Sequence, residues 1–224
     1  MKLLKQKSFR KNIIYIYNII KMEETKIYSD FIKFKKNDPM QFYYFKNIFN
    51  EHEIETILES VNNMDLLDGT LARANTSNEV DKEYRRSKLC WFPKTQKYKW
   101  LYEKLGQLAN KANDSLWNFD ITGMAESIQY AEYDQDYKGY YDWHTDVGNA
   151  EVSKRKISIS VQLSDPSEYE GGELQLYYRK DIVTVERSIG TVILFPSYFL
   201  HKVQPITKGI RKSLVLWISG PPFK

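Results

Sequence analysis

The sequence predicts a mainly β domain with flanking helices, of the β-sandwich or jelly-roll type. Two segments with helical spacing lie within the first 116 residues, and from residue 121 onward the apolar pattern changes to short strands separated by turn residues. The chain has 224 residues, of which 42% are hydrophobic and 15% aromatic, enough for the core of one domain. We therefore expect a single domain over residues 31–224, preceded by a basic N-terminal extension over residues 1–30.

Two amphipathic helices are predicted before the strands begin. The first follows Asn50, which has the spacing of a capping box with Glu53. Its apolar positions, at helical intervals, are Ile54, Ile57, Leu58 and Val61. The second extends from about Lys97 to Leu116, and its apolar stripe consists of Trp100, Leu101, Leu105, Leu108 and Ala112. One-sided stripes of this kind predict helices packed on the outside of a sheet.

A long polar segment, residues 67–86, separates these helices. It contains Gly, Asn and Ser and lacks an apolar repeat, so we expect an exposed loop. A loop of this length in a compact domain is often a lid over a binding site. A simple connector between the two helices fits the residues equally well.

Strands follow the second helix at short, regular intervals. Turn residues separate the apolar segments, among them the Gly-containing stretches 165–172 and 204–209. The predicted strands are 121–133, 140–143, 155–163, 173–178, 182–187, 191–195 and 212–219. This number of strands after two helices is typical of a sandwich or jelly roll.

The charges exclude a broad surface for nucleic acid. Residues 1–22 carry six of the 33 Lys and Arg residues and no acidic residue, so the rest of the chain has 27 basic and 29 acidic groups. A basic footprint is therefore absent from the predicted domain, and we expect no nucleic-acid partner.

The cysteine content and the apolar segments predict a cytoplasmic location without a membrane partner. Cys90 is the only cysteine, which excludes a disulfide framework, and its apolar neighbours KLCWF favour a core position. Residues 12–20 (NIIYIYNII) are too short to span a bilayer and favour an extension over a membrane anchor.

The tripeptide His144-Thr145-Asp146 is the most informative functional signal. At a strand end, residues i and i+2 point to one face, so the imidazole and the carboxylate are directed to one point. His201 follows 57 residues later, in the exit turn of the apolar run 191–195. Two histidines and one carboxylate form the facial triad of non-haem Fe(II) oxygenases. The same ligands also suit zinc, which the sequence leaves open.

An arginine and a serine follow the second histidine on a predicted strand. Arg211 comes ten residues after His201, and Ser213 lies on the same strand face as Arg211. A guanidinium is a fixed fork that pairs with a carboxylate through two hydrogen bonds. Arg211 is therefore suited to hold the far carboxylate of a dicarboxylic acid that chelates the metal, and this favours iron over zinc.

Three stretches of the sequence resemble Fe(II)/2-oxoglutarate-dependent dioxygenases, and among them the prolyl 4-hydroxylase-like branch. They are IQYAEYDQDYKGYYDWHTD, RKISISVQLSDPSEYEGGELQLYY and GTVILFPSYFLHKVQPITKGIRKSLVLWIS. The resemblance covers roughly residues 40–220. It implies a double-stranded β-helix core, a jelly-roll or cupin-like architecture.

The resemblance also implies roles for the residues of the motif. The Fe(II) ligands would be His144, Asp146 and His201. Arg211 would pair with the distal carboxylate of 2-oxoglutarate, assisted by Ser213. Tyr133 falls near the place where family members have a tyrosine that hydrogen-bonds this co-substrate, with one extra residue in the intervening turn.

The strand predicted over residues 155–163 alternates between polar and apolar residues. Its polar face carries Ser158, Ser160 and Gln162. We expect this face to line the co-substrate pocket, with Gln162 in contact with 2-oxoglutarate, although a solvent-exposed face fits the same alternation. The expected apolar walls of the pocket are Leu174 and Phe195.

The activity implied by the resemblance is hydroxylation of peptidyl proline, with 2-oxoglutarate and O2 consumed, succinate and CO2 released, and ascorbate (vitamin C) as a further cofactor. The partner would be a peptide or protein that contains proline. The candidate substrate contacts are Arg85, Arg86, Trp91, Tyr141 and Trp217, although ordinary strand-edge positions for the first three and core positions for the last two fit the sequence equally well. The carboxylate of Asp146 favours hydroxylation over halogenation, because family halogenases lack it.

Three other functions compete with this one. A hydroxylase of a free amino acid or small metabolite remains open, because the sequence does not fix the size of the substrate. A non-catalytic cupin-like binding protein would normally lack one ligand, whereas all three are present here. A nucleic-acid demethylase would carry a second arginine where Trp217 stands.

Overall fold

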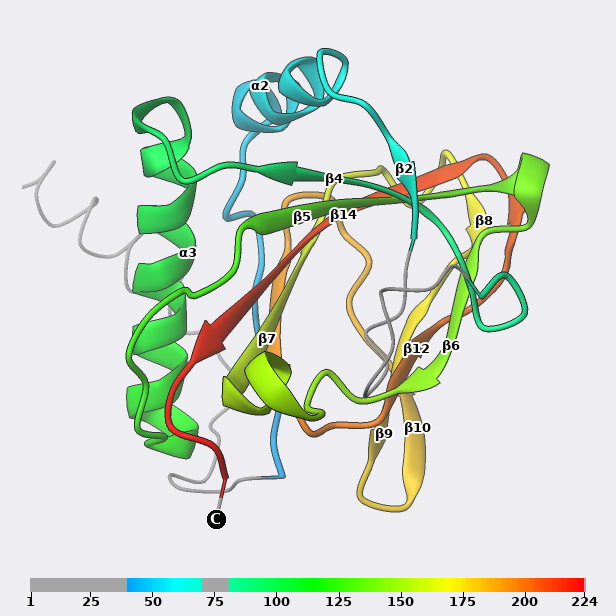
Figure 1. Ribbon diagram of the computed structural model, residues 1–224. Helices are drawn as coiled ribbons and strands as arrows, with labels where there is room; N and C mark the ends of the chain where they lie inside the picture. Colours follow the sequence, from blue (N-terminus) through cyan, green and yellow to red (C-terminus); the bar gives the residue numbers. More distant parts are fainter. Residues whose placement is uncertain (1–39, 70–80, 224) are drawn as a thin grey trace, which may run out of the picture. The chain divides into compact units, whose positions relative to one another are not determined.

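The computed structural model describes residues 40–69 and 81–223. Within these ranges the chain forms two α-helices and fourteen β-strands, and the strands make three antiparallel sheets (Figure 1). None of the described helices is both long and apolar enough to cross a lipid bilayer. The extension predicted over residues 1–30 lies outside the described residues, so the proposed division of the chain remains a prediction.

Both predicted helices are confirmed. Helix α2 (Glu51–Val61) begins at the predicted capping box, in which the Glu53 N–H donates to Asn50 Oδ1 and the Asn50 N–H donates to Glu53 Oε2, each over 3.0 Å. Helix α3 (Lys99–Ala112) is preceded by a 3-10 turn and continued by a π-helical turn. These turns are Gln96–Tyr98 and Asn113–Trp117.

The larger sheet has seven strands. In spatial order they are β1 (Tyr43–Phe45), β11 (Val192–Pro196), β7 (Arg155–Gln162), β14 (Ile210–Ser219), β5 (Ile128–Asp134), β4 (Lys88–Phe92) and β2 (Leu67–Asp68). The long strands β7, β14 and β5 lie at its centre, so side chains on them have a rigid support.

The second sheet has five shorter strands. In spatial order they are β10 (Asp181–Thr184), β9 (Leu174–Tyr178), β12 (His201–Val203), β6 (Tyr140–His144) and β3 (Arg85–Arg86). The remaining pair consists of β13 (Ile206–Lys208) and β8 (Glu170–Gly171).

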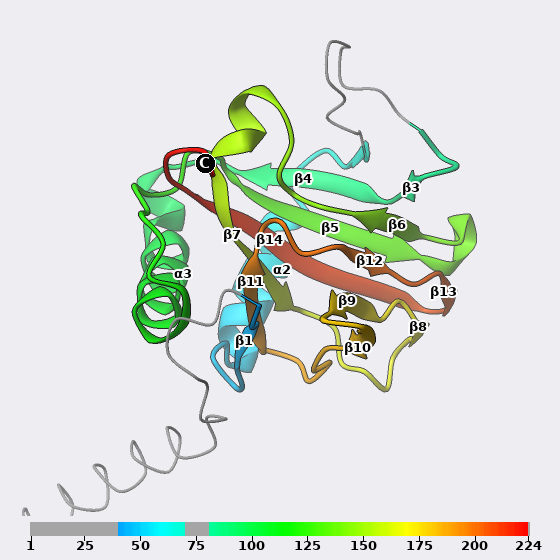
Figure 2. The ribbon, with the colours of Figure 1, turned by 90° about the horizontal axis from the view of Figure 1, so that it is seen from below.

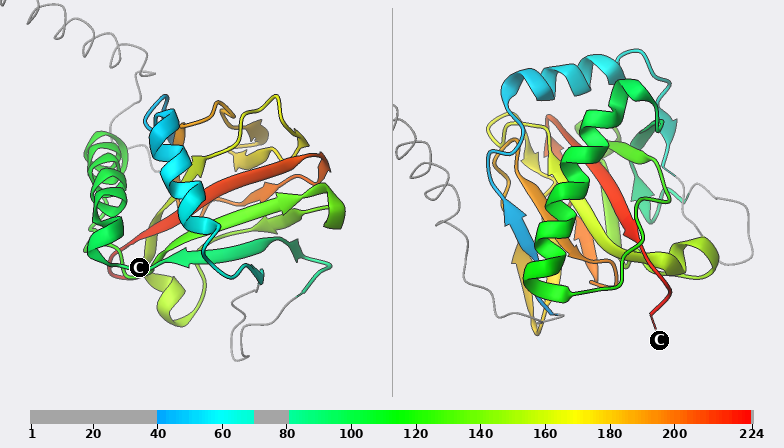
Figure 3. Two further views of the ribbon diagram at one scale, coloured as in Figure 1. Left: turned by 90° about the horizontal axis from the view of Figure 1, so that it is seen from above. Right: turned by 90° about the vertical axis from the view of Figure 1, so that its left-hand side faces the viewer.

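The core lies between the two larger sheets, which pack face to face (Figure 2). Buried apolar side chains from both sheets meet there, and they include Ala131, Ile193, Phe195, Leu174, Leu176 and Val203. The helices α2 and α3 cover the other face of the seven-stranded sheet (Figure 3). The predicted mainly β class with flanking helices is therefore confirmed, and the position of Cys90 in the core is confirmed as well.

Three local predictions are wrong. The strand predicted over residues 121–133 begins only at Ile128, because Gly123 has a φ of 139° and makes no more than an isolated bridge. His201 lies on strand β12 rather than in a turn. The segment 67–86 is not a loop throughout, because strands β2 and β3 form its two ends. Its centre, residues 70–80, lies outside the described residues, as does most of the predicted lid.

Candidate active site

A cavity of about 390 Å³ lies between the two larger sheets, and both sheets contribute to its walls. From the seven-stranded sheet come Tyr133, Ser158, Ser160, Arg211, Ser213 and Trp217. From the five-stranded sheet and its loops come Arg85, Tyr141, His144, Asp146, Leu174 and His201. Most residues that the sequence singled out therefore surround one space.

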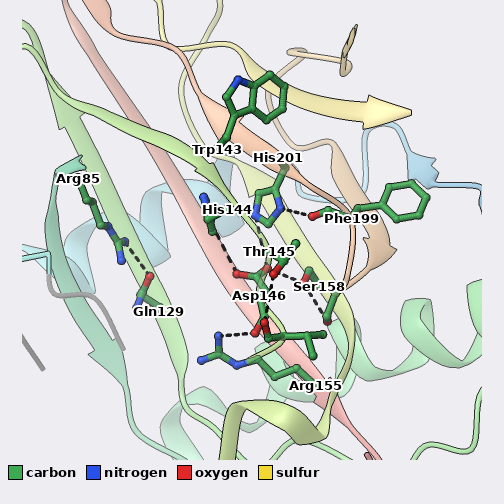
Figure 4. A network of polar contacts seen from close by, with 12 residues as sticks. Arg85, Gln129, Trp143, His144, Thr145, Asp146, Arg155, Ser158, Phe199 and His201 are labelled. Carbon is green, nitrogen blue, oxygen red and sulfur yellow. Dashed lines mark hydrogen bonds and ion pairs between the residues drawn. The ribbon is translucent and has the colours of Figure 1, made fainter. Parts of the chain in front are cut away.

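The predicted triad is brought together at one end of this cavity (Figure 4). His144 is the last residue of β6, His201 is the first residue of β12, and the two are direct partners across the strands. Asp146 lies two residues beyond β6. Its carboxylate oxygens are 3.8 Å from His144 Nε2 and 3.5 Å from His201 Nε2.

Backbone carbonyls orient both imidazoles. Nδ1 of His144 lies 2.7 Å from the carbonyl of Asp142, and Nδ1 of His201 lies 2.8 Å from the carbonyl of Phe199. A carbonyl only accepts, so each Nδ1 carries a proton, and in a neutral imidazole Nε2 then has a free lone pair. This is the arrangement in which a histidine binds a metal through one nitrogen while the other is held in place.

The surroundings of His144 and Asp146 favour the protonation states that a cation requires. Burial and the nearby His201 lower the pKa of His144 to about 3, so its imidazole is neutral at physiological pH. Burial opposes ionisation of Asp146, but the neighbouring His201 and His144 outweigh it and lower the pKa of the carboxyl to about 2. At physiological pH the site therefore offers the neutral imidazole of His144 and the carboxylate of Asp146.

Arg211 lies on β14 six residues from Trp217, which pairs across the strands with Ser158 beside Asp146, so it occupies the other end of the cavity. Its side chain is buried, and the residue is only 2% exposed. Its Nη2 donates to Oε1 of Gln162 over 3.0 Å, and its guanidinium lies 5.6 Å from the centre of the Tyr133 ring. Among the described residues no carboxylate pairs with it. A buried guanidinium without a carboxylate partner is suited to an anionic ligand, because burying an unpaired charge is costly.

The polar face of β7 is buried rather than exposed to solvent. Ser158 and Ser160 line the cavity, and Gln162, 2% exposed, stands beside Arg211 without forming part of the lining. The solvent-exposed alternative for this face is therefore wrong. Gln162 also donates through Nε2 to the carbonyl of Glu186 over 3.2 Å, so it connects Arg211 to the surrounding structure.

The candidate substrate contacts separate into two groups. Arg85, Trp91, Tyr141 and Trp217 line the cavity. Arg86 does not line it, because neighbouring residues of a strand point to opposite faces. Its Nε donates instead to the carbonyl of Lys82 over 2.8 Å. Leu174 and Phe195 are among the apolar residues that line the cavity, where they were expected.

Tyr141 and Arg85 lie next to the triad, on the side of β3, which is an edge strand of the five-stranded sheet. The Tyr141 ring stacks on the imidazole of His144, with ring centres 3.5 Å apart and planes at 15°. The guanidinium of Arg85 lies 4.5 Å from the centre of the same tyrosine ring. Arg85 Nη2 also donates to Oε1 of Gln129 over 3.2 Å. Arg85 therefore contacts the ring that stacks on a triad histidine.

Sequence reasoning missed two further groups of the cavity. Gln129 lies four residues before Tyr133 on β5, so the strand alternation places both on the same face and was a usable signal. Arg155 pairs with Glu126, lies 3.6 Å from the centre of the Trp217 ring and donates through Nη1 to the carbonyl of Asp146 over 3.3 Å. Nothing in the local sequence indicated this second group.

The donor atoms fit a resident cation at the triad. One ligand atom from each of His144, Asp146 and His201 lies within 4.8 Å of the others, which suits one ion with three protein ligands. The indole N–H of Trp217, on the cavity wall, is buried and makes no hydrogen bond within the described residues. A bound polar group can use this donor.

Comparison with known protein families identifies the segment that carries this site. Residues 128–219, from the start of β5 to the end of β14, match the family model of the 2OG-Fe(II) oxygenase superfamily. The matched segment contains the triad and Arg211.

Curated relatives match over part of their length. A PKHD-type hydroxylase of Synechococcus sp. (strain CC9902) is 41% identical over 80 residues, which cover 36% of this chain and 36% of the relative. A PKHD-type hydroxylase of Crocosphaera subtropica (strain ATCC 51142 / BH68) is 32% identical over 95 residues, which cover 41% of this chain and 42% of the relative. The matches therefore span less than half of these relatives.

Solved structures share the fold over most of the domain. A prolyl hydroxylase from Trichoplax adhaerens, in complex with a peptide fragment of the hypoxia inducible factor oxygen degradation domain, superposes with a TM-score of 0.67 at 22% identity, covering 80% of this chain and 83% of that one. A Pseudomonas putida prolyl-4-hydroxylase gives a TM-score of 0.62 at 18% identity, covering 80% and 92%. The expected double-stranded β-helix core is confirmed.

Proposed function

Because the chain belongs, through residues 128–219, to the 2OG-Fe(II) oxygenase superfamily, we propose that it is an Fe(II)- and 2-oxoglutarate-dependent hydroxylase of peptidyl proline. The observation that carries this proposal is a single cavity with a candidate cation site at one end and the buried Arg211 at the other. A dicarboxylate that chelates the ion and pairs with the guanidinium satisfies both ends.

Different residues of the cavity bind the ion and the co-substrate. His144, Asp146 and His201 hold Fe(II). Bound Fe(II) supplies the coupled oxidation in which 2-oxoglutarate and O2 become succinate and CO2 while one oxygen atom is inserted into a C–H bond of the substrate. Arg211 holds the distal carboxylate, and the Ser213 hydroxyl lines the cavity close by on the same strand.

The apolar walls keep the co-substrate in one pose and limit water. Leu174 and Phe195 are 4% and 2% exposed and line the cavity from opposite sheets. In such a setting the charge-assisted pair between Arg211 and a carboxylate is stronger than it would be in water. The chain thereby orients the co-substrate before the substrate arrives.

Aromatic and cationic residues of the cavity wall favour a prolyl peptide as the substrate. Tyr141, Trp91 and Trp217 present aromatic surface on which a pyrrolidine ring can pack. Arg85 adds donors for peptide carbonyls. The curated relatives are PKHD-type hydroxylases, and the Trichoplax structure holds a peptide, which supports the same substrate class.

The test is succinate formation from 2-oxoglutarate with Fe(II) and ascorbate, with and without a panel of proline-containing peptides. Peptide-stimulated turnover together with hydroxylated product is the expected result. Succinate formation that no peptide stimulates would transfer the assignment to a free amino acid or small metabolite. Absence of turnover with iron bound would contradict the enzymatic assignment and favour a binding protein.

A further inference from the structure

Two buried serines, Ser158 and Ser197, lie behind the carboxylate of Asp146, and Figure 4 shows Ser158 beside it. The Ser158 hydroxyl donates to Asp146 Oδ2 over 2.6 Å, and its oxygen lies 3.0 Å from the hydroxyl of Ser197. Both serines have no exposed surface. A hydroxyl carries one proton, and a carboxylate only accepts, so Ser158 gives its proton to Asp146 and Ser197 is the donor at the second contact.

The backbone around Asp146 is held from the same side. The Asp146 N–H donates to the carbonyl of Ser197 over 2.9 Å, and Nη1 of Arg155 donates to the carbonyl of Asp146 over 3.3 Å. Ser158 itself lies on β7, between β11 and β14 in the seven-stranded sheet. Asp146, which lies outside any strand, is thus hydrogen-bonded to β7, a central strand of the opposite sheet.

We propose that Ser158, supported by Ser197, is a positioning residue that fixes the Asp146 carboxylate for the ion. The inference rests on the proposed function and adds a role for β7, which the sequence had assigned only to the co-substrate pocket. Without the Ser158 hydroxyl, Asp146 is free to rotate about its side-chain bond, and its oxygens no longer face both Nε2 atoms. Partners behind a metal ligand act in this way in metal sites generally.

The two serines predict different effects. Removing the Ser158 hydroxyl with Ser158→Ala should weaken metal binding by about 10- to 100-fold, the range typical for such partners. Ser197→Ala should weaken it less, because Ser197 acts on the carboxylate through Ser158. In the Ser158→Ala background, Ser197→Ala should have no further effect, since the chain of donors is already broken. Ser158→Thr, which keeps the hydroxyl, should restore binding.

The experiment is a titration of the full-length metal-free protein with Co(II), followed by calorimetry and visible absorption. Ser60→Ala is the matched control, because Ser60 is also buried and donates to the carbonyl of Thr56 over 2.9 Å, but on helix α2. Its Co(II) affinity should equal that of the unmodified protein. Thermal unfolding of each metal-free variant separates loss of fold from loss of affinity.

The outcomes separate this inference from the proposed function. Binding by the unmodified protein but not by His144→Ala is required by the proposed function, and failure there removes both proposals. Unchanged affinity and an unchanged Co(II) spectrum in Ser158→Ala would overturn the positioning role alone. If Ser158→Ala does not fold, the decision passes to Ser197→Ala, whose unchanged affinity would overturn the role of the serine pair.

Discussion

At one end of the cavity, β6 and β12 bring two imidazoles and a carboxylate together, and at the other end β14 buries a single guanidinium. The triad end groups one carboxylate and two imidazoles whose ligand atoms lie within 4.8 Å of one another, an arrangement that suits a cation. At the Arg211 end a positive charge has the amide oxygen of Gln162 but no carboxylate among the described residues. The two ends therefore require ligands of opposite charge.

The two ends of the cavity are also held by different sheets. The five-stranded sheet holds the two triad histidines on short strands, and its register shifts between His201 and Val203. The seven-stranded sheet holds Arg211 on its longest strand, with Tyr133 and Gln162 on the strands on either side. The contrast teaches that the Arg211 end is fixed by regular strand alternation. The triad end depends in addition on a loop residue, Asp146, whose side chain must be positioned separately.

The largest effect is expected at the triad. His144→Ala or His201→Ala removes one of three candidate ligands, so iron-dependent succinate formation should fall to background while the fold is retained. The third histidine of the chain provides a matched control, because His52 is exposed on helix α2. His52→Ala should keep full activity. Full activity in His144→Ala would exclude the assigned cation site.

A smaller, selective effect is expected at the other end. Arg211→Ala removes a charge-assisted pair, worth about 1.5–3 kcal/mol per hydrogen bond, and should raise the KM for 2-oxoglutarate by at least about tenfold. Iron affinity in the metal-free protein should stay unchanged. Gln162→Ala should shift the same KM in the same direction but less, because it loosens Arg211 without removing the charge. Equal loss of iron affinity in Arg211→Ala would show that the two ends are not separate.

The two ends should also differ in their response to acid. An unfolded histidine binds its proton near pH 6.5, whereas burial lowers the pKa of His144 to about 3 in the folded protein. The unfolded state therefore takes up more protons between these values, and the stability of the metal-free protein should fall as the pH decreases from 6.5 toward 3. Asp146, with a pKa lowered from 3.8 to about 2, adds a further loss below pH 4.

Urea unfolding at a series of pH values measures this response. His144→Asn lacks the titrating group and should show a shallower decrease between pH 6.5 and 3. Arg211→Met should leave the pH slope unaltered, since an arginine keeps its charge over this range. A slope that is identical in His144→Asn and the unmodified protein would contradict the burial argument.

The residues at the Arg211 end were largely predictable from the sequence, whereas the arrangement at the triad end was predictable only in part. The alternation of β7 predicted the shared face of Ser158, Ser160 and Gln162, and alternation on β5 would have added Gln129 to Tyr133. Such patterns are local, so a single strand contains them. The spacing of the triad predicted its chemistry, but it did not predict how the three residues meet.

The parts that escaped prediction depend on contacts between distant segments. His201 was expected in a turn, but pairing with His144 makes it the first residue of a strand. Ser158 reaches Asp146, and Arg155 reaches Glu126, only because separate segments pack together. Arg86 was grouped with Arg85 and Trp91 as a candidate substrate contact, although alternation on a strand allows only one of the two neighbouring arginines to face the cavity.

The smallest expected effect concerns these two neighbouring arginines on β3. Arg85 lines the cavity beside Tyr141, so Arg85→Met should raise the KM for the most strongly stimulating peptide by several-fold, up to about tenfold for a loss near 1.4 kcal/mol. Arg86 points away and contacts Lys82 and the Tyr140 ring, so Arg86→Met should change that KM by less than about twofold. The KM for 2-oxoglutarate should stay constant in both variants, because Arg211 is unaltered. If Arg86→Met raised the KM for the peptide more than Arg85→Met did, the substrate would bind on the opposite face of β3, outside the cavity.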